Sequence, residues 1–180
     1  PEAIVHAPDL LAKILKPEHR FGLPYPWQGW NDLTEGMKPG QLIMVSGGTG
    51  IGKSLFTRSI ALHLCKQDVK VAYIGLEESC ETSLERMLSE ELGFNPGFHL
   101  DTPEQRERRD PEEIKAALDR FANNLYLLDK FGSDDFDSFV ATVKHYVLGE
   151  QCQVVVLDHF SLLADGIALN TDQRRAIDRC

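Results

Sequence analysis

The sequence predicts an α/β fold in which helices flank a mostly parallel sheet. Short apolar runs alternate along the chain with amphipathic segments, which is the order of strand–helix–strand units. Each run is almost uniformly apolar, as expected of strands that are covered on both faces in a parallel sheet. The first run leads through a glycine-rich turn directly into a helix, which is the connection of a doubly wound sheet.

The first part of the chain precedes this pattern. The stretch "PDLLAKILK" places its apolar residues on one helical stripe, made by Leu10, Leu11, Ile14 and Leu15. The next stretch, "GLPYPWQGWNDLTEGMKPG", is rich in Pro, Gly and Trp and is expected to be irregular or turn-rich. We therefore expect residues 1–38 to form an N-terminal helix and an approach segment, and residues 39–180 to belong to the α/β core.

Four strands and five helices are expected after the approach segment. The strands are the apolar runs at residues 41–46, 69–76, 125–129 and 153–158. The helices are expected at residues 53–66, 80–92, 111–123, 134–148 and from about 171 onward. Pro111 followed by Glu112 and Glu113 is a typical helix start, because it combines a fixed φ with acids near the positive end of the helix dipole.

Composition limits the class of protein. With 180 residues, 42% of them hydrophobic, the chain can form one globular domain with a core. No apolar run approaches the roughly 20 residues of a membrane span. The net charge of −9 argues against a broadly basic nucleic-acid surface but leaves a small basic loop possible.

Two further features concern the setting of the chain. The cysteines have no CxxC spacing and are expected to be free thiols in a reducing cytosol: Cys65, Cys80, Cys152 and Cys180. The chain begins without Met or a secretory signal and ends in what reads as the first turns of a helix. We therefore expect it to be a piece of a longer protein.

The segment GGTGIGKS fits the pattern G-x-x-x-x-G-K-[ST] of a phosphate-binding loop (P-loop). Its glycines let backbone N–H groups turn inward around a β-phosphate, and the following helix adds its positive dipole end. Lys53 is expected to supply a positive charge to the β- and γ-phosphate oxygens, and the Ser54 hydroxyl is expected to bind Mg²⁺. The residues expected to bind ATP or another nucleoside triphosphate are Gly47, Gly48, Thr49, Gly50, Ile51, Gly52, Lys53 and Ser54.

Hydrolysis needs two carboxylates as well, one near Mg²⁺ and one that accepts a proton from the attacking water. The run "VVVLD" ends at Asp158 in the Walker B pattern, and this carboxylate is expected to hold Mg²⁺ through water. The run "VAYIGLEES" ends with Glu77 and Glu78. Glu77 lies 77 − 53 = 24 residues past Lys53, which in a parallel sheet returns it to the edge that holds the phosphates. We prefer Glu77 as the catalytic base, and Glu78 stays open as the alternative or as an acid at a helix start.

Together, three segments resemble the RecA-like motor domain of DnaB-type replicative DNA helicases: "GWNDLTEGMKPGQLIMVSGGTGIGKS", "GLEES" and "VVVLDHFSLL". Phage primase-helicases and the mitochondrial helicase Twinkle are the most similar members, and the resemblance covers about residues 29–178. In that family the first glutamate after the strand is the base, which corresponds to Glu77. The family's loop lysine, hydroxyl and Walker B aspartate correspond to Lys53, Ser54 and Asp158.

The resemblance implies a ring, usually a hexamer, that hydrolyses ATP with Mg²⁺ between subunits, moves along single-stranded DNA and unwinds duplex DNA. The helical stripe at residues 10–15 would be a linker helix that docks on the neighbouring subunit, or else a helix packed on its own domain. The resemblance also implies a fused or associated primase as a partner, and it implies no association with a membrane. The implied location is the cytoplasm, or the host cytoplasm for a phage protein, with an organellar matrix left open.

The family also has parts that lie downstream of Walker B: a γ-phosphate sensor, DNA-gripping loops, an arginine finger and a strand inserted between those of the P-loop and Walker B. We therefore expect a C-terminally truncated core that hydrolyses ATP poorly alone and exposes strand edges and apolar surface. Two other interpretations stay open. One is a RecA-superfamily ATPase with another output, such as a KaiC-like switch or a RadA-like recombination factor. The other is a nucleotide-gated module without hydrolysis, which the presence of both Glu77 and Asp158 disfavours.

Overall fold

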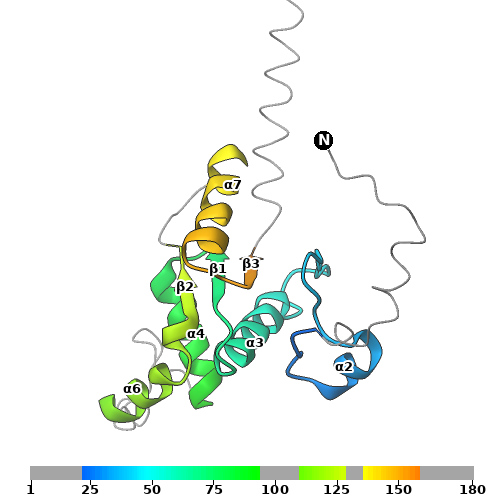
Figure 1. Ribbon diagram of the computed structural model, residues 1–180. Coiled ribbons are helices and arrows are strands. Elements are labelled where there is room, and N and C mark those ends of the chain that lie inside the picture. The colour runs from blue at the N-terminus through cyan, green and yellow to red at the C-terminus, as the bar shows by residue number, and fades with distance from the viewer. Residues whose placement is uncertain (1–21, 94–109, 129–135, 159–180) are drawn as a thin grey trace, which may run out of the picture. The chain divides into compact units, whose positions relative to one another are not determined.

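The computed structural model describes residues 22–93, 110–128 and 136–158 (Figure 1). The chain divides into two compact units, Pro1–Met44 and Val45–Cys180, and each is described by itself. The expected helical stripe at residues 10–15 and the helix expected from about residue 171 lie outside the described residues.

The first unit contains a short helix within the segment that its composition predicts to be irregular. Helix α2 (Gln28–Thr34) ends at Glu35, whose φ of 59° is left-handed. Its Asn31 side chain accepts a hydrogen bond from the Tyr25 backbone N–H at 2.8 Å and donates one to the Tyr25 carbonyl at 2.9 Å. Leu23 and Met37 pair in an antiparallel bridge on either side of the helix. The segment is therefore turn-rich, as expected, but side-chain-to-backbone hydrogen bonds also order one helix in it.

The second unit is built on a parallel sheet of three described strands, β1 (Val71–Gly75), β2 (Leu125–Leu127) and β3 (Val154–Asp158). Their order is β2-β1-β3, so the strand that comes first in the sequence lies in the middle (Figure 1). Every residue of β1 is buried, whereas β2 and β3 at the edges are half-buried. Three of the four expected strands are thus confirmed, and only the central one is fully covered on both faces.

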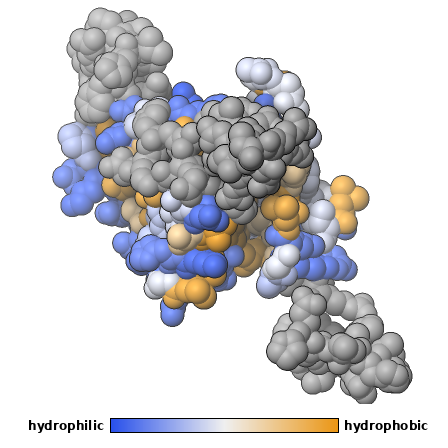
Figure 2. Space-filling model, turned by 90° about the horizontal axis from the view of Figure 1, so that it is seen from above, coloured by the Kyte–Doolittle hydropathy of each residue, from blue (hydrophilic) through white to orange (hydrophobic). Residues whose placement is uncertain are grey.

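The prediction of a strand at residues 41–46 is wrong, because this run forms no strand in the described structure. Its apolar side chains are exposed instead, with Leu42 and Met44 at 92% and 73% of full exposure. An apolar run becomes a strand only when a partner takes up its backbone hydrogen bonds, and among the described residues no strand pairs with this run. Hydrophobic side chains (orange) also reach the surface on the face drawn in Figure 2.

Helices α3 (Lys53–Cys65), α4 (Cys80–Leu92) and α6 (Pro111–Asp119) begin where the sequence predicts. Helices α3 and α4 match their expected ranges closely. The Ser79 hydroxyl caps α4 by accepting a hydrogen bond from the Thr82 N–H at 3.2 Å. Asp110 caps α6 in the same way by accepting from the Glu112 N–H at 2.9 Å. Side-chain caps of this kind fix a helix start locally, which is why the sequence predicts these starts well.

The helix ends are less regular than expected. Helix α6 stops at Asp119 rather than at residue 123, and a 3₁₀ turn (Ala122–Asn124) follows. The turn buries Phe121, 1% exposed, and leads directly into β2. Helix α7 (Phe136–Lys144) continues into a π-helical turn (His145–Gly149), which brings it close to the expected end. Helix α6 thus ends just before a turn that buries an aromatic side chain, and helical periodicity does not contain that information.

The core of this unit surrounds β1. Ala72 and Ile74 belong to a buried cluster with Tyr146 and Cys152, against which residues of α7 pack. Because side chains alternate along a strand, Tyr73 points to the opposite face, and α3 also packs on β1. The sheet therefore has helical cover on both faces around its central strand, with the start of α3 near the carboxyl ends of the strands. Within the described ranges, none of the helices combines the length and apolarity that crossing a bilayer requires.

Candidate functional site

The P-loop curls around the side chain of its own lysine. Lys53 Nζ donates hydrogen bonds to the carbonyl oxygens of Gly47 at 3.0 Å and Gly48 at 2.8 Å. Gly52, the residue before α3, has a φ of 94°, in the left-handed region that favours glycine. Gly50 has a φ of 79°, in the same region. The backbone of the loop therefore favours glycine at these two positions, and the ammonium group of Lys53 lies against the loop's own carbonyls.

The chemistry of this loop fits a triphosphate. The loop ends at the N-terminus of α3, where free N–H groups and the helix dipole favour an anion. The first turn of α3 contains no acidic residue that would repel one. The exposed Lys53 ammonium adds a mobile cation at the same place, and the Ser54 hydroxyl adds an oxygen ligand of the type that Mg²⁺ accepts.

Asp158 is the last residue of β3 and lies at the carboxyl edge of the sheet. It is the register partner of Gly75, and its backbone carbonyl accepts a hydrogen bond from the Leu76 N–H at 2.7 Å. Helix α3, which begins with Lys53 and Ser54, packs on β3. The structure thus brings Asp158 and the turn after β1 to one edge of the sheet, and it places α3 against the strand that ends there.

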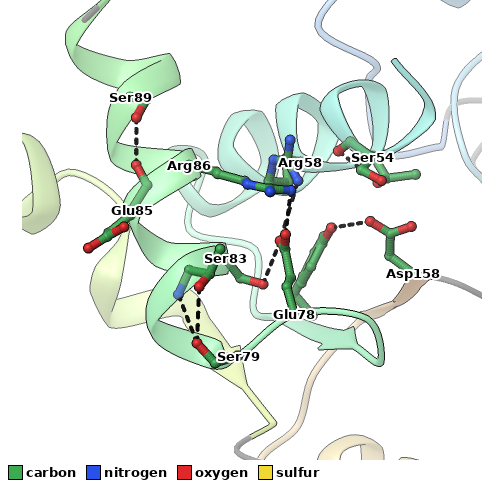
Figure 3. Close-up of polar contacts among 12 residues, drawn as sticks. Ser54, Arg58, Glu78, Ser79, Ser83, Glu85, Arg86, Ser89 and Asp158 are labelled. Atoms are coloured by element: carbon green, nitrogen blue, oxygen red, sulfur yellow. Dashed lines mark hydrogen bonds and ion pairs between the residues drawn. The ribbon is translucent and has the colours of Figure 1, made fainter. Parts of the chain in front are cut away.

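The two glutamates after β1 have different surroundings. Glu77 is exposed, whereas Glu78 is half-buried and held by three neighbours. The Ser83 hydroxyl donates a hydrogen bond to Glu78 Oε1 at 2.9 Å, and the guanidinium of Arg58 lies 3.5 Å from the same oxygen. Arg86 forms an ion pair with the other oxygen, Oε2 (Figure 3). Glu78 therefore acts as an anchor for the turn that carries Glu77.

Arg58 joins this turn to two helices. Its side chain is 7% exposed and lies on α3, one helical turn after Ser54. Arg58 Nε donates to Glu90 Oε1 at 3.1 Å, and the Ser59 hydroxyl donates to Glu90 Oε2 at 2.9 Å. Burial raises the pKa of Glu90, and its hydrogen bonds with Ser59 and Arg58 oppose that shift. The P-loop helix, the turn after β1 and α4 are thus held together by charged side chains.

Sequence reasoning missed Arg58 as a functional neighbour. The available signal was an arginine within a helix that is otherwise largely apolar after its first turn. Such an arginine is expected to be buried, and a buried arginine requires acidic partners. Which acids would supply the partners was not readable, because Glu78 and Glu90 are 20 and 32 residues away along the chain.

Tyr73 is a second residue that the sequence did not reveal. It lies in the middle of β1 with 1% of its surface exposed, and its hydroxyl donates a hydrogen bond to Asp158 Oδ2 at 2.8 Å. Burial and the nearby charge of Asp158 raise the pKa of the Tyr73 hydroxyl above its ordinary value. The hydroxyl therefore stays protonated and available as a donor. A tyrosine in an apolar strand gives little sign of this, because its ring suits the core equally well.

Comparison with known proteins agrees with this arrangement. Residues 22–178 match the family described as DnaB-like helicase C terminal domain. The DNA helicase/primase of Enterobacteria phage T3 is 31% identical over 196 aligned positions, which cover 99% of this chain and 32% of the phage protein. The chain therefore spans about a third of that relative's length.

A solved structure described as the ATPase domain of G40P superposes with a TM-score of 0.67 at 15% identity. The superposition covers 89% of this chain and 59% of that one. At this identity the similarity concerns the fold, and it confirms the predicted class of a parallel sheet flanked by helices, as in RecA-like helicase ATPase domains.

Proposed function

The chain belongs to the DnaB-like helicase C-terminal domain family, and from this premise we propose that it is the nucleotide-hydrolysing motor of a replicative DNA helicase. The observation that carries the proposal is the geometry at one edge of the sheet. A lysine-containing loop opens α3, Asp158 ends β3, and Glu77 follows β1, the strand paired with β3. The predicted resemblance to DnaB-type helicases is confirmed by the family match.

The P-loop residues would bind ATP or another nucleoside triphosphate. Lys53 would leave the carbonyls of Gly47 and Gly48 and neutralise charge on the β- and γ-phosphates. Ser54 and Asp158 would hold Mg²⁺, Asp158 through water. When bound, Mg²⁺ would supply a Lewis acid that offsets the negative charge developing on the phosphates.

Glu77 would accept the proton of the attacking water. Its neighbour Glu78 is held by Arg58, Arg86 and Ser83, so that carboxylate is engaged in structural contacts. Glu77 is exposed at the same edge and can therefore approach a water molecule beside the phosphates. A general base in this position contributes about 10²–10⁴ to the rate.

The proposed output is movement on single-stranded DNA and unwinding of duplex DNA by a ring of identical subunits, usually a hexamer. The phage T3 relative is named a DNA helicase/primase, which favours this output over a switch or a recombination factor and suggests that a primase is fused to or associated with the motor. Replication in the cytoplasm, or in the host cytoplasm for a phage protein, is the setting that fits this role.

Unwinding of a forked duplex by the full-length protein tests the proposal. We expect unwinding that requires ATP and Mg²⁺ and that is lost in Lys53→Ala together with nucleotide binding. Lys115→Ala, which removes an exposed lysine on α6, serves as the matched control and should unwind normally. Hydrolysis stimulated by single-stranded DNA but without unwinding would instead favour a RecA-superfamily ATPase with another output.

A further inference from the structure

The hydrogen bond from Tyr73 to Asp158 joins the middle of one strand to the end of the next. Tyr73 comes two residues before Gly75, the register partner of Asp158, and lies on the face of β1 that α3 covers. Its hydroxyl is 2.8 Å from Asp158 Oδ2. One oxygen of this carboxylate is therefore held from within the core of the protein.

The hydroxyl also lies close to the helix that carries the other proposed magnesium ligand. Helix α3, which carries Ser54 and Thr57, packs on β1, the strand of Tyr73. Thr57 Oγ1 in turn donates to the backbone carbonyl of Ser54 at 3.1 Å. The helix that carries Ser54 thus packs against the strand whose Tyr73 holds Asp158.

This arrangement does more than fill the core. A phenylalanine would occupy the same space without the cost of burying a hydroxyl, which only a hydrogen bond offsets. The partner that offsets it here is the carboxylate of Asp158. A hydrogen bond to a charged acceptor in a buried place is short and directional, so it restricts rotation of the carboxylate.

We propose that Tyr73 is a positioning residue that fixes the orientation of the Asp158 carboxylate for Mg²⁺. The inference rests on the proposed function, which assigns Asp158 to the cation. Tyr73 acts through Asp158 and touches neither nucleotide nor metal. Residues that orient a metal-binding carboxylate in this way typically change metal affinity 10–100-fold when they are removed.

Tyr73→Phe in the full-length protein removes the hydroxyl and keeps the ring. We expect nucleotide affinity measured in excess chelator, with a fluorescent ATP analogue, to stay within about twofold of the unaltered protein. Adding Mg²⁺ should increase nucleotide affinity in both proteins. The Mg²⁺ concentration that gives half of this increase (the Mg²⁺ midpoint) should be about 10–100-fold higher in Tyr73→Phe. Binding of Mn²⁺ in the presence of nucleotide, followed by electron paramagnetic resonance, gives an independent readout without hydrolysis.

Tyr146→Phe is the matched control. It removes the hydroxyl of another buried tyrosine, which donates to the Leu127 carbonyl at 3.3 Å. Tyr146 belongs to the buried cluster with Ala72 and Ile74, on the other face of β1. It should lower thermal stability to a similar degree and leave the Mg²⁺ midpoint unchanged. Equal shifts of the Mg²⁺ midpoint in Tyr146→Phe and Tyr73→Phe would mean that a general loss of core packing weakens metal binding, and this result would overturn the inference.

Asp158→Asn separates this inference from the proposed function. If Asp158→Asn raises the Mg²⁺ midpoint and Tyr73→Phe does not, Tyr73 is no positioning residue, although the proposed metal site stands. If neither variant raises the midpoint, the assignment of Asp158 fails and the inference fails with it. In the double variant, Tyr73→Phe should add nothing to the effect of Asp158→Asn, because the hydroxyl acts through that carboxylate. Additive effects would contradict the inference.

Discussion

Adjacent glutamates at the end of β1 illustrate how surroundings assign roles to identical residues. Glu78 is held by two arginines and a serine, and Glu77 next to it is exposed. The sequence placed both directly after an apolar strand, where the structure also has them, but their surroundings were not readable, because the partners of Glu78 come from α3 and α4. The preference for Glu77 rests on its spacing from Lys53 and stays a prediction.

The first prediction concerns this pair. Glu77→Gln should retain nucleotide binding and lower ATP turnover by about 10²–10⁴, because the amide cannot accept the proton of the attacking water. Turnover and equilibrium binding of a fluorescent nucleotide are measured in the full-length protein. Glu112→Gln, which neutralises an exposed glutamate on α6, is the control. Turnover that survives in Glu77→Gln would show that another group is the base.

The second prediction concerns Arg58. Replacing it by Met leaves Glu78 and Glu90 without their shared cation in a site where the carboxylates are only 15% and 16% exposed. Removing one partner of a buried ion pair typically costs about 3–5 kcal/mol, so the free energy of unfolding should fall by about that amount. Denaturant unfolding measures it. Lys66→Met, which breaks the ion pair of a more exposed lysine with Glu91, should cost far less.

At the scale of elements, the sequence predicted what local chemistry decides. Helix starts were predictable because Ser79 and Asp110 supply their own caps, and three strands were predictable because their apolar runs are continuous. The run at residues 41–46 has the same composition but no strand beside it in the described structure. Strand formation depends on a partner elsewhere in the chain, and composition cannot show whether that partner is in place.

The two helix caps provide a third prediction. Ser79→Ala and Asp110→Ala should each lower the free energy of unfolding by about 1 kcal/mol, because each leaves a backbone N–H of the first turn without its acceptor. Only Ser79 adjoins the turn of Glu77 and Glu78, so only Ser79→Ala should also lower ATP turnover. Unfolding and turnover are measured on the same preparations. An equal loss of turnover in both variants would mean that the effect follows stability alone.

At the scale of the whole molecule, the described sheet is covered on its faces but open at its edges. Strand β3, which ends in Asp158, is an edge strand among the described residues, and Leu42 and Met44 expose most of their apolar surface. The chain spans about a third of the length of its phage relative. Exposed apolar runs and open strand edges favour association with other chains, so a site that is well formed locally can still belong to a marginally stable molecule.

The fourth prediction follows from this surface. The 180-residue chain expressed alone should self-associate. Leu42→Ser combined with Met44→Ser should reduce that association, because the two residues are 92% and 73% exposed and their replacement removes apolar surface from water. Light scattering against protein concentration measures it. Leu33→Ser is the matched control, since Leu33 is also 86% exposed but lies on the short helix α2, outside the run at residues 41–46. If the control reduces association as strongly as the pair does, scattered apolar exposure rather than the run before the P-loop drives it. If the unaltered chain is a stable monomer with full ATP turnover, the surface has no such role.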